Sequence, residues 1–205
     1  MPLFHIHGLI ASLLSSIVTG SSVVCTSGFN ALTFYGNIKN FKPTWITAVP
    51  TMYQAILSRA SRNKEIIQTS SLRLLRSSSA AMPVATIEAL ENAFQCPVIE
   101  AYGMTEASHQ MASNFLDGIR KAGSVGKSAG PEIALFKDNK LINVSNTIGE
   151  IVIRGTNVTN GYKNNDKANK ENFFNGWFRT GDLGKFDEDG SVSYTHLRAH
   201  ETDRY

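Results

Sequence analysis

Apolar residues recur with helical spacing in some stretches of the chain and form short continuous runs in others, and the two patterns alternate over residues 9–102. The helical spacing predicts helices at residues 9–18, 30–39, 50–57 and 83–94. The short runs predict strands at residues 23–25, 45–49, 72–75 and 96–101. Strands that alternate with helices are typical of an α/β fold with a mostly parallel sheet.

The pattern changes past Asp117. Later apolar segments are short, and glycines interrupt the chain at positions 118, 123, 126 and 130, which predicts antiparallel β structure. Asp187-Glu188-Asp189-Gly190 should close a hairpin, because Asp-Gly tolerates a positive φ. A calcium-binding EF-hand loop is the alternative, but its Glu at loop position 12 is missing. We therefore expect part of an α/β subdomain over residues 1–117 and a β-rich subdomain over residues 118–193.

Composition narrows the possible functions. The 205 residues are 42% hydrophobic and 18% charged, which is typical of a globular chain and excludes a disordered one. The 20 basic and 17 acidic residues are spread along the chain and indicate neither a nucleic-acid nor a membrane-surface partner. Residues 9–18, the longest apolar stretch, are shorter than the ~20 residues of a membrane span. Cys25 and Cys96 suggest neither a disulfide framework nor zinc, which favours a reducing compartment.

Two predicted loops follow strands of the first sheet, where open α/β sheets bind ligands. In the loop at residues 77–83, the small residues Ser79, Ala80 and Ala81 would let a flat ring approach the backbone. The loop at residues 102–106 combines an aromatic ring, a glycine, a hydroxyl and a carboxylate. The two loops together are suited to a nucleotide.

The individual side chains fit the same ligand. Tyr102 can stack on a purine, and Thr105 can donate to a phosphate oxygen. Glu106 can bind Mg²⁺, which usually takes one or two carboxylates besides phosphates and water. Asp182 follows a glycine and can accept both hydroxyls of a ribose. A tyrosine at a strand end and an aspartate in a turn are also common in purely structural roles, so their chemistry alone leaves both interpretations open.

Four segments in order resemble the adenylate-forming acyl-CoA synthetases, a superfamily of AMP-dependent synthetases and ligases: Pro2–Gly8, Tyr102–Glu106, Gly149–Gly155 with Gly161-Tyr162, and Trp177–Asp182. Residues 48–51, 100–111 and 157–165 are similar to the oxalyl-CoA synthetase branch. This resemblance implies that the chain is the central part of the large N-terminal domain of such an enzyme. The implied fold is a mostly parallel βαβ sheet followed by a small β-rich subdomain.

The resemblance also implies a reaction in two steps. A carboxylate attacks the α-phosphorus of MgATP to give an acyl adenylate and pyrophosphate, and the thiol of coenzyme A then displaces AMP. Carried over by position, the implied roles begin with the nucleotide, which Ser79, Ala80 and Ala81 would line. Glu100 and Ala101 would lie beside the adenine edge, Tyr102 would stack on the adenine, and Gly103 would be part of the nucleotide-binding segment. Thr105 would contact phosphate, Glu106 would bind Mg²⁺ and Asp182 would hold the ribose. Thr105 and Glu106 would be the catalytic pair.

The substrate that the similar branch implies is a small dianion, oxalate, so its pocket should offer hydrogen-bond donors. The candidates are His5, Ser79 and His109, with His7 less favoured because one residue of a His-x-His pair faces away in an extended segment. Metal binding by His5, His7 and Cys25 lacks a second closely spaced ligand pair. The alternatives are a coumarate-like or medium-chain acyl-CoA ligase, with apolar residues where His109 and Ser79 stand, and a non-catalytic nucleotide-binding protein.

Synthetases of this kind also carry an upstream phosphate loop and, after a Gly-Arg hinge, a small C-terminal domain with a lysine needed for adenylation. Between Ser193 and His196 the chain departs from their pattern, and residues 194–205 resemble translated vector sequence. We therefore expect residues 194–205 to be a non-native tail and the chain to be a central fragment of a larger enzyme, inactive on its own. The full-length enzyme is expected in the cytoplasm or the peroxisome. Its expected partners are the carboxylate, ATP and CoA, and no protein partner is predicted.

Overall fold

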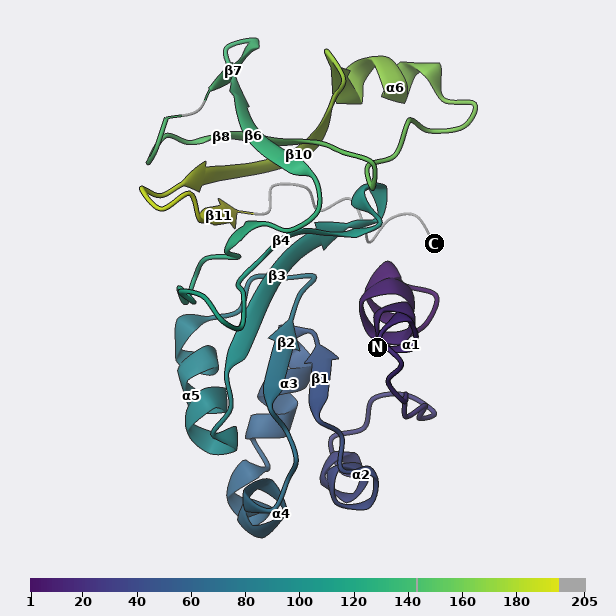
Figure 1. The fold of residues 1–205 in the computed structure, drawn as a ribbon, viewed down its shortest axis with the longest axis vertical. Helices are drawn as coiled ribbons and strands as arrows, with labels where there is room; N and C mark the ends of the chain where they lie inside the picture. Colours follow the sequence, from purple (N-terminus) through teal and green to yellow (C-terminus); the bar gives the residue numbers. More distant parts are fainter. Residues whose placement is uncertain (143, 196–205) are drawn as a thin grey trace.

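The fold consists of two β-sheets with helices around the first (Figure 1). The computed structural model describes residues 1–142 and 144–195. The first sheet has the strand order β1-β2-β3-β4-β5, with β1 (Trp45–Ala48), β2 (Leu74–Ser77), β3 (Val98–Met104), β4 (His109–Ser113) and β5 (Lys127–Ser128). β1, β2 and β3 pair in parallel, and β4 and β5 add antiparallel strands. The mixed α/β class predicted from the sequence is confirmed.

The second sheet is antiparallel, as predicted. Its order is β11-β10-β8-β6-β7, and β9 pairs with β10. The strands are β6 (Glu132–Lys137), β7 (Lys140–Ile142), β8 (Gly149–Arg154), β9 (Phe173–Phe174), β10 (Trp177–Phe186) and β11 (Val192–Thr195). Helix α6 (Asp166–Asn172) precedes β9, and the side chain of Asn165 caps its N-terminus by accepting from the Ala168 amide.

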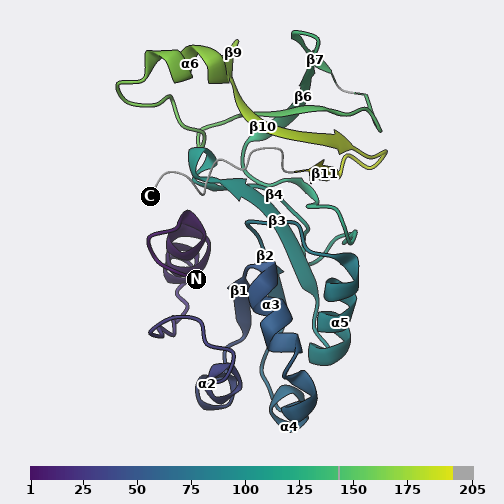
Figure 2. The same ribbon diagram turned by 180° about the vertical axis from the view of Figure 1, so that it is seen from behind.

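Helices enclose both faces of the first sheet (Figures 1 and 2). α3 (Pro50–Leu57) and α5 (Val84–Phe94) share a core with β2 and β3 that includes Ile56, Leu75 and Leu90. Because successive strand residues point to opposite faces, Arg76 lies on the other side from Leu75. That side is covered by the π-helix η1 (His7–Leu14), which continues into α1 (Ser15–Val18). The remaining helices are α2 (Phe34–Phe41), η2 (Ala60–Arg62), α4 (Lys64–Gln68) and η3 (Thr105–Ala107).

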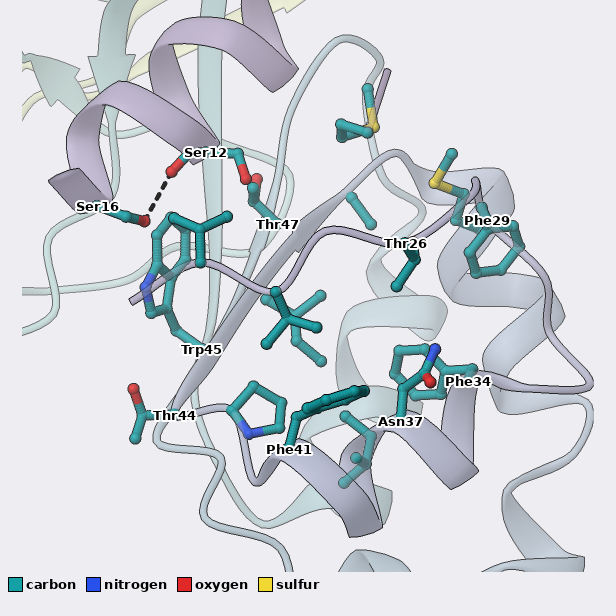
Figure 3. A pocket seen from close by; sticks show the side chains of 18 of the residues that line it. Ser12, Ser16, Thr26, Phe29, Phe34, Asn37, Phe41, Thr44, Trp45 and Thr47 are labelled. Atoms are coloured by element: carbon teal, nitrogen blue, oxygen red, sulfur yellow. Dashed lines mark hydrogen bonds between the residues drawn. The ribbon is translucent and has the colours of Figure 1, made fainter. Parts of the chain in front are cut away.

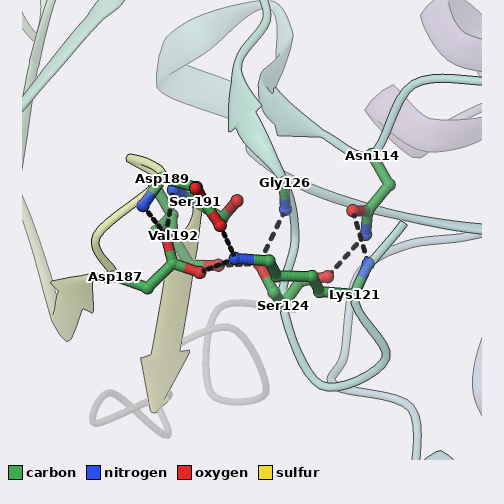
Figure 4. A network of polar contacts seen from close by, with 8 residues as sticks. All are labelled: Asn114, Lys121, Ser124, Gly126, Asp187, Asp189, Ser191 and Val192. Carbon is green, nitrogen blue, oxygen red and sulfur yellow. Dashed lines mark hydrogen bonds and ion pairs between the residues drawn. The ribbon is translucent and has the colours of Figure 1, made fainter. Parts of the chain in front are cut away.

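The predicted hairpin at Asp187–Gly190 is confirmed. The Asp187 carboxylate accepts from the amides of Asp189 and Ser191, and Gly190 has a φ of 75°. Lys121 donates to Asp187 and Asp189 at 2.5 Å each, so both carboxylates tie the hairpin to the loop before β5 (Figure 4). This ion pairing gives the acidic residues a structural role.

Several predicted elements were wrong or displaced. Residues 23–25 form no strand: they are largely exposed, and no described strand lies beside them to complete a hydrogen-bond ladder. The helix predicted at 30–39 begins only at Phe34. β3 continues to Met104, so Tyr102, Gly103 and Met104 lie in a strand that pairs with β4 rather than in a loop.

The first sheet extends to residues 127–128, beyond the predicted subdomain boundary at 117, and that division of the chain remains a prediction. Of the predicted non-native tail at residues 194–205, Tyr194 and Thr195 lie in β11 and pair with β10. From residue 196 onward the tail lies outside the described residues. Among the described helices, none combines the length and the apolarity that a membrane crossing requires.

Gly103 provides a test of this packing. A Cβ atom at position 103 would lie 1.7 Å from the backbone oxygen of His109, and backbone cannot move aside as a flexible side chain can. Gly103→Ala should therefore lower the free energy of unfolding by about 3 kcal/mol or more, measured by urea denaturation.

Gly36 is the matched control. It is an exposed residue of α2, and a Cβ atom added there would have no neighbour within 4 Å. Gly36→Ala should raise the free energy of unfolding by about 0.5–1 kcal/mol, because alanine favours a helix interior. Equal effects of the two substitutions would contradict the close approach at Gly103.

Candidate functional site

Tyr102 and Asp182 meet between the two sheets. The Tyr102 hydroxyl donates to Oδ2 of Asp182 at 2.5 Å, and each residue is only 3% exposed. Burial, and then the nearby Asp182 carboxylate, raise the pKa of Tyr102 well above its ordinary value, so the phenol keeps its proton and remains a donor. The ring also stacks on Tyr194 with 4.2 Å between centroids. The structure thus brings together the residues predicted for adenine and ribose.

A break in the regular pairing of β10 positions Asp182. The register with β8 shifts between Arg179 and Leu183, and Gly181 has a φ of 79°. Glu150 holds this irregularity, because its carboxylate accepts from the Gly181 amide at 3.0 Å and from Arg179 at 2.6 Å. Such bulges reorient side chains next to binding sites.

Glu106 lies in η3 at the tip of the β3–β4 hairpin, next to the exposed Thr105. Its Oε1 accepts from the Tyr162 hydroxyl at 2.9 Å, while Oε2 accepts no hydrogen bond from the described residues. One available carboxylate oxygen fits Mg²⁺, which takes few protein ligands when it also binds phosphates. The described residues contain no group of three or more His, Cys, Asp or Glu placed to hold a metal ion on their own.

The carboxylate of Glu100 is hydrogen-bonded to the backbone of two loops. Its carboxylate accepts from the backbone amides of Met82 at 3.3 Å and Gly123 at 3.2 Å, and burial raises its pKa. It therefore links the loop after β2 to the loop before β5. That first loop presents the predicted nucleotide-lining residues at the surface, since all three are exposed: Ser79, Ala80 and Ala81. Ala101 is buried within β3.

Two histidines pack together on the η1 side of the first sheet. His7 and His109 are each 2% exposed, with their ring centroids 5.1 Å apart. His7 makes hydrogen bonds to Ser79 Oγ at 3.0 Å and Thr47 Oγ1 at 2.6 Å. His5 is exposed beside Phe4, so it is His7 that joins Ser79 and His109. A role for His5 at the acyl pocket remains a prediction.

Sequence reasoning missed Arg76. This residue is 9% exposed, and it donates to Thr47 Oγ1 at 3.3 Å and to Gln110 Oε1 at 3.1 Å. The signal was its position at the carboxyl end of an apolar strand, next to the serine-rich loop. Arg76 and Thr47 are directly paired in the parallel register of β1 and β2, which explains their contact.

Both buried histidines are neutral at pH 7. Burial first, and then the charge of Arg76, lower the pKa of His7 from 6.5 to about 3 and that of His109 from 6.5 to about 4. The polar cluster made of His7, Thr47, Arg76, Ser79, His109 and Gln110, here called the histidine cluster, therefore carries one positive charge, that of Arg76.

The backbone is unfavourable at two members of this cluster. Ser79 has a φ of 74° and His109 a φ of 87°, and Ser108 between β3 and β4 has a φ of 50°. Left-handed conformations of non-glycine residues cost about 1–3 kcal/mol and are concentrated at functional sites. Strain at two of the three predicted substrate residues, Ser79 and His109, supports the position of the site.

A separate pocket of about 540 Å³ lies between η1, the segment at residues 21–30, α2 and β1 (Figure 3). Its lining combines aromatic side chains such as Phe34, Phe41 and Trp45 with serine and asparagine. Thr47 is the member of the histidine cluster that borders it. The pocket is distinct from the contact between Tyr102 and Asp182.

Comparison with known proteins agrees with these features. Residues 1–163 match the family described as AMP-binding enzyme. An oxalate–CoA ligase of Arabidopsis thaliana is 49% identical over 201 residues, covering 96% of this chain and 38% of the relative. An oxalate–CoA ligase of Saccharomyces cerevisiae is 45% identical, covering 95% of this chain and 36% of the relative. The chain thus spans less than two fifths of these relatives.

Among solved structures, an O-succinylbenzoate coenzyme A synthetase from Bacillus subtilis in complex with ATP and magnesium ion matches with a TM-score of 0.82 and 33% identity. The match covers 95% of this chain and 40% of that structure. The fold therefore recurs in a protein that holds the nucleotide and metal for which Tyr102, Glu106 and Asp182 are candidates.

The neutral histidines predict a pH dependence of stability. Each has a folded-state pKa below its unfolded value of 6.5, so the unfolded chain takes up the proton first as the pH falls. Stability should be fully present above about pH 6.5 and decrease toward pH 4 by about 1.4 kcal/mol per pH unit for each histidine. Urea unfolding at several pH values measures this slope.

Replacing both His7 and His109 by Asn should flatten the slope, because the titrating groups are gone. His5→Asn is the control, and because His5 is exposed this change should leave the slope as in the wild type. If the free energy of unfolding changes with pH equally in the wild type and the double variant, these histidines do not take up protons on unfolding.

Proposed function

The chain belongs to the AMP-binding enzyme family, and from this premise we propose that it forms part of an ATP-dependent acyl-CoA ligase whose substrate is a small dianion, with oxalate as the first choice. The observation that carries the choice is the histidine cluster. It places polar groups and a positive charge around Ser79 and His109, where a ligase for an apolar acid needs apolar contacts. The two oxalate–CoA ligases among the relatives support the same substrate.

In the proposed reaction, one carboxylate of the substrate attacks the α-phosphorus of ATP, pyrophosphate leaves, and the thiol of CoA then displaces AMP from the acyl adenylate. The residues of this chain act by position and electrostatics. Asp182 would accept from the ribose, and Thr105 would donate to a phosphate oxygen. A magnesium ion bound at Glu106 would neutralise phosphate charge.

Tyr102 would contact the adenine. In the structure one face of its ring is covered by Tyr194, and its hydroxyl is bonded to Asp182. Adenine would therefore either use the opposite face of the ring or displace Tyr194. Glu100, Ala101 and Gly103 would lie along the nucleotide as parts of β3, with Ser79, Ala80 and Ala81 opposite. A cytoplasmic or peroxisomal location remains a prediction.

The proposed function is tested with a full-length enzyme that contains this chain. AMP release should depend on ATP and CoA and should be fastest with oxalate in a panel that includes acetate, a medium-chain acid and a hydroxycinnamate. His109→Asn, which tolerates the positive φ, should lower kcat/KM for oxalate by about 1.5–3 kcal/mol, the scale of a hydrogen bond to a charged group. Acetate turnover should fall much less, because acetate has no second charge.

A wild-type preference for medium-chain or hydroxycinnamic acids would contradict the dianion and leave a ligase of the alternative kind. The pocket in Figure 3, with its aromatic lining, would then be the place to look for that substrate. No AMP release with any acid would contradict the ligase itself.

Glu106 provides a test of the metal assignment. Glu106→Gln keeps the shape and removes the charge, so it should lower kcat by about 10²-fold or more, and added Mg²⁺ should restore part of the rate. AMP binding should change little, because the adenine and ribose contacts lie elsewhere. The control is Glu171→Gln, an exposed carboxylate on α6, which should alter neither quantity. The assignment fails if Mg²⁺ restores nothing and AMP affinity falls with the rate.

A further inference from the structure

Arg76 is a buried cation that has no carboxylate partner among the described residues. Its guanidinium makes hydrogen bonds with three neutral groups, on Thr47, Gln110 and His7. Within residues 1–142 and 144–195, none of the ion pairs involves Arg76. A buried charge is normally paired, because removing it from water is costly.

The charge itself is retained. Burial lowers the pKa of Arg76 to about 10, which still leaves the guanidinium protonated at pH 7. Neither neighbouring histidine contributes a second positive charge, since both are neutral. The histidine cluster therefore has a net charge of +1, and no described residue supplies it with the anion that would balance this charge.

The donors and acceptors in the hydrogen bonds from Arg76 to Ser79 can be assigned one after another. Arg76 has only donors, so Oγ1 of Thr47 accepts from it, and the Thr47 hydroxyl proton is left for Nε2 of His7 at 2.6 Å. With Nε2 as acceptor, the proton of the neutral ring is on Nδ1 and is donated to Ser79 Oγ at 3.0 Å. The Ser79 hydroxyl proton is then available to a ligand.

Two further observations point to a ligand at the same place. Ser79 is an exposed residue, so the relay ends at the surface, while Arg76 at its start is buried. Both ring nitrogens of His109 are buried and make no hydrogen bond with any described residue. Buried polar atoms without partners are rare in native proteins and require an explanation. The neutral His109 ring has one N–H, and an acceptor oxygen of an anion at this place would satisfy that N–H.

We propose that Arg76 determines specificity for a doubly charged substrate: through Thr47 and His7 it fixes Ser79 as a donor, and its positive charge compensates the second carboxylate, the one that is not adenylated. Arg76 is thus a positioning residue for the substrate. The inference rests on the proposed ligase function and adds to it the group that separates a dianion from a monoanion of the same shape.

The experiment compares oxalate with oxamate, in which an amide replaces one carboxylate. In the full-length enzyme, Arg76→Met should raise the KM for oxalate by about 10-fold or more, while the Ki of oxamate as a competitor of oxalate changes by less than about 3-fold. Arg76→Lys keeps a charge and should recover part of the oxalate KM. Arg73→Met, an exposed arginine just before the same strand, is the control and should change neither constant.

Thr47→Val tests the relay independently of the charge, and it decides the matter if Arg76→Met does not fold. It removes the bridging hydroxyl at nearly constant shape and should also raise the oxalate KM with little effect on oxamate. Equal losses for oxalate and oxamate, or an unchanged oxalate KM in the Thr47→Val variant and in Arg76→Met where that variant folds, would overturn the inference. Absence of oxalate-dependent AMP release in the wild type would instead refute the proposed function.

Discussion

The contact between the backbones of Gly103 and His109 sets the geometry of the β3–β4 hairpin, which carries Glu106 and His109. Because a Cβ atom at position 103 would lie 1.7 Å from the His109 oxygen, β3 and β4 can approach this closely only with glycine there. The tight connection between them forces Ser108 and His109 into left-handed conformations. As a result Glu106 stands at the tip of the hairpin, while His109 turns back into the buried face of the first sheet.

Local signals in the sequence were sufficient for much of the fold. Pro50 marks the first residue of α3, and the Asp-Gly pair marks the β10–β11 hairpin, because in each case a backbone preference of the residue itself decides the structure. Residues 23–25 have strand-like composition, but no described strand lies beside them to pair with. The end of β3 was also misplaced, since its pairing partner β4 lies beyond the motif and does not affect the local pattern.

Some residues of the candidate site could also be predicted from the sequence, and others could not. Tyr102, Glu106 and Asp182 were found from residue type and family pattern, and the structure brings Tyr102 and Asp182 into hydrogen-bond contact. His7 was disfavoured on the assumption that residues 5–7 are extended, and this was wrong. Helix η1 begins at His7, and its packing on the first sheet buries this histidine. The position of Arg76 at a strand end was visible in the sequence, but its burial could not be predicted. Charged residues are seldom buried, and the burial depends on helix η1 and strand β4, both distant in sequence.

The two halves of the site are held by different physical interactions. Tyr102 and Asp182 belong to the packed interior between the sheets, where the Tyr194 ring and the shared hydrogen bond fix their positions. The histidine cluster is held by hydrogen bonds around one buried charge, and that charge also helps to keep its histidines neutral. A neutral imidazole can accept at one nitrogen and donate at the other, whereas a protonated one only donates. The buried cation therefore allows His7 to accept a hydrogen bond from Thr47 and to donate one to Ser79. A carboxylate of the protein paired with Arg76 would neutralise the positive charge that is available to a dianion.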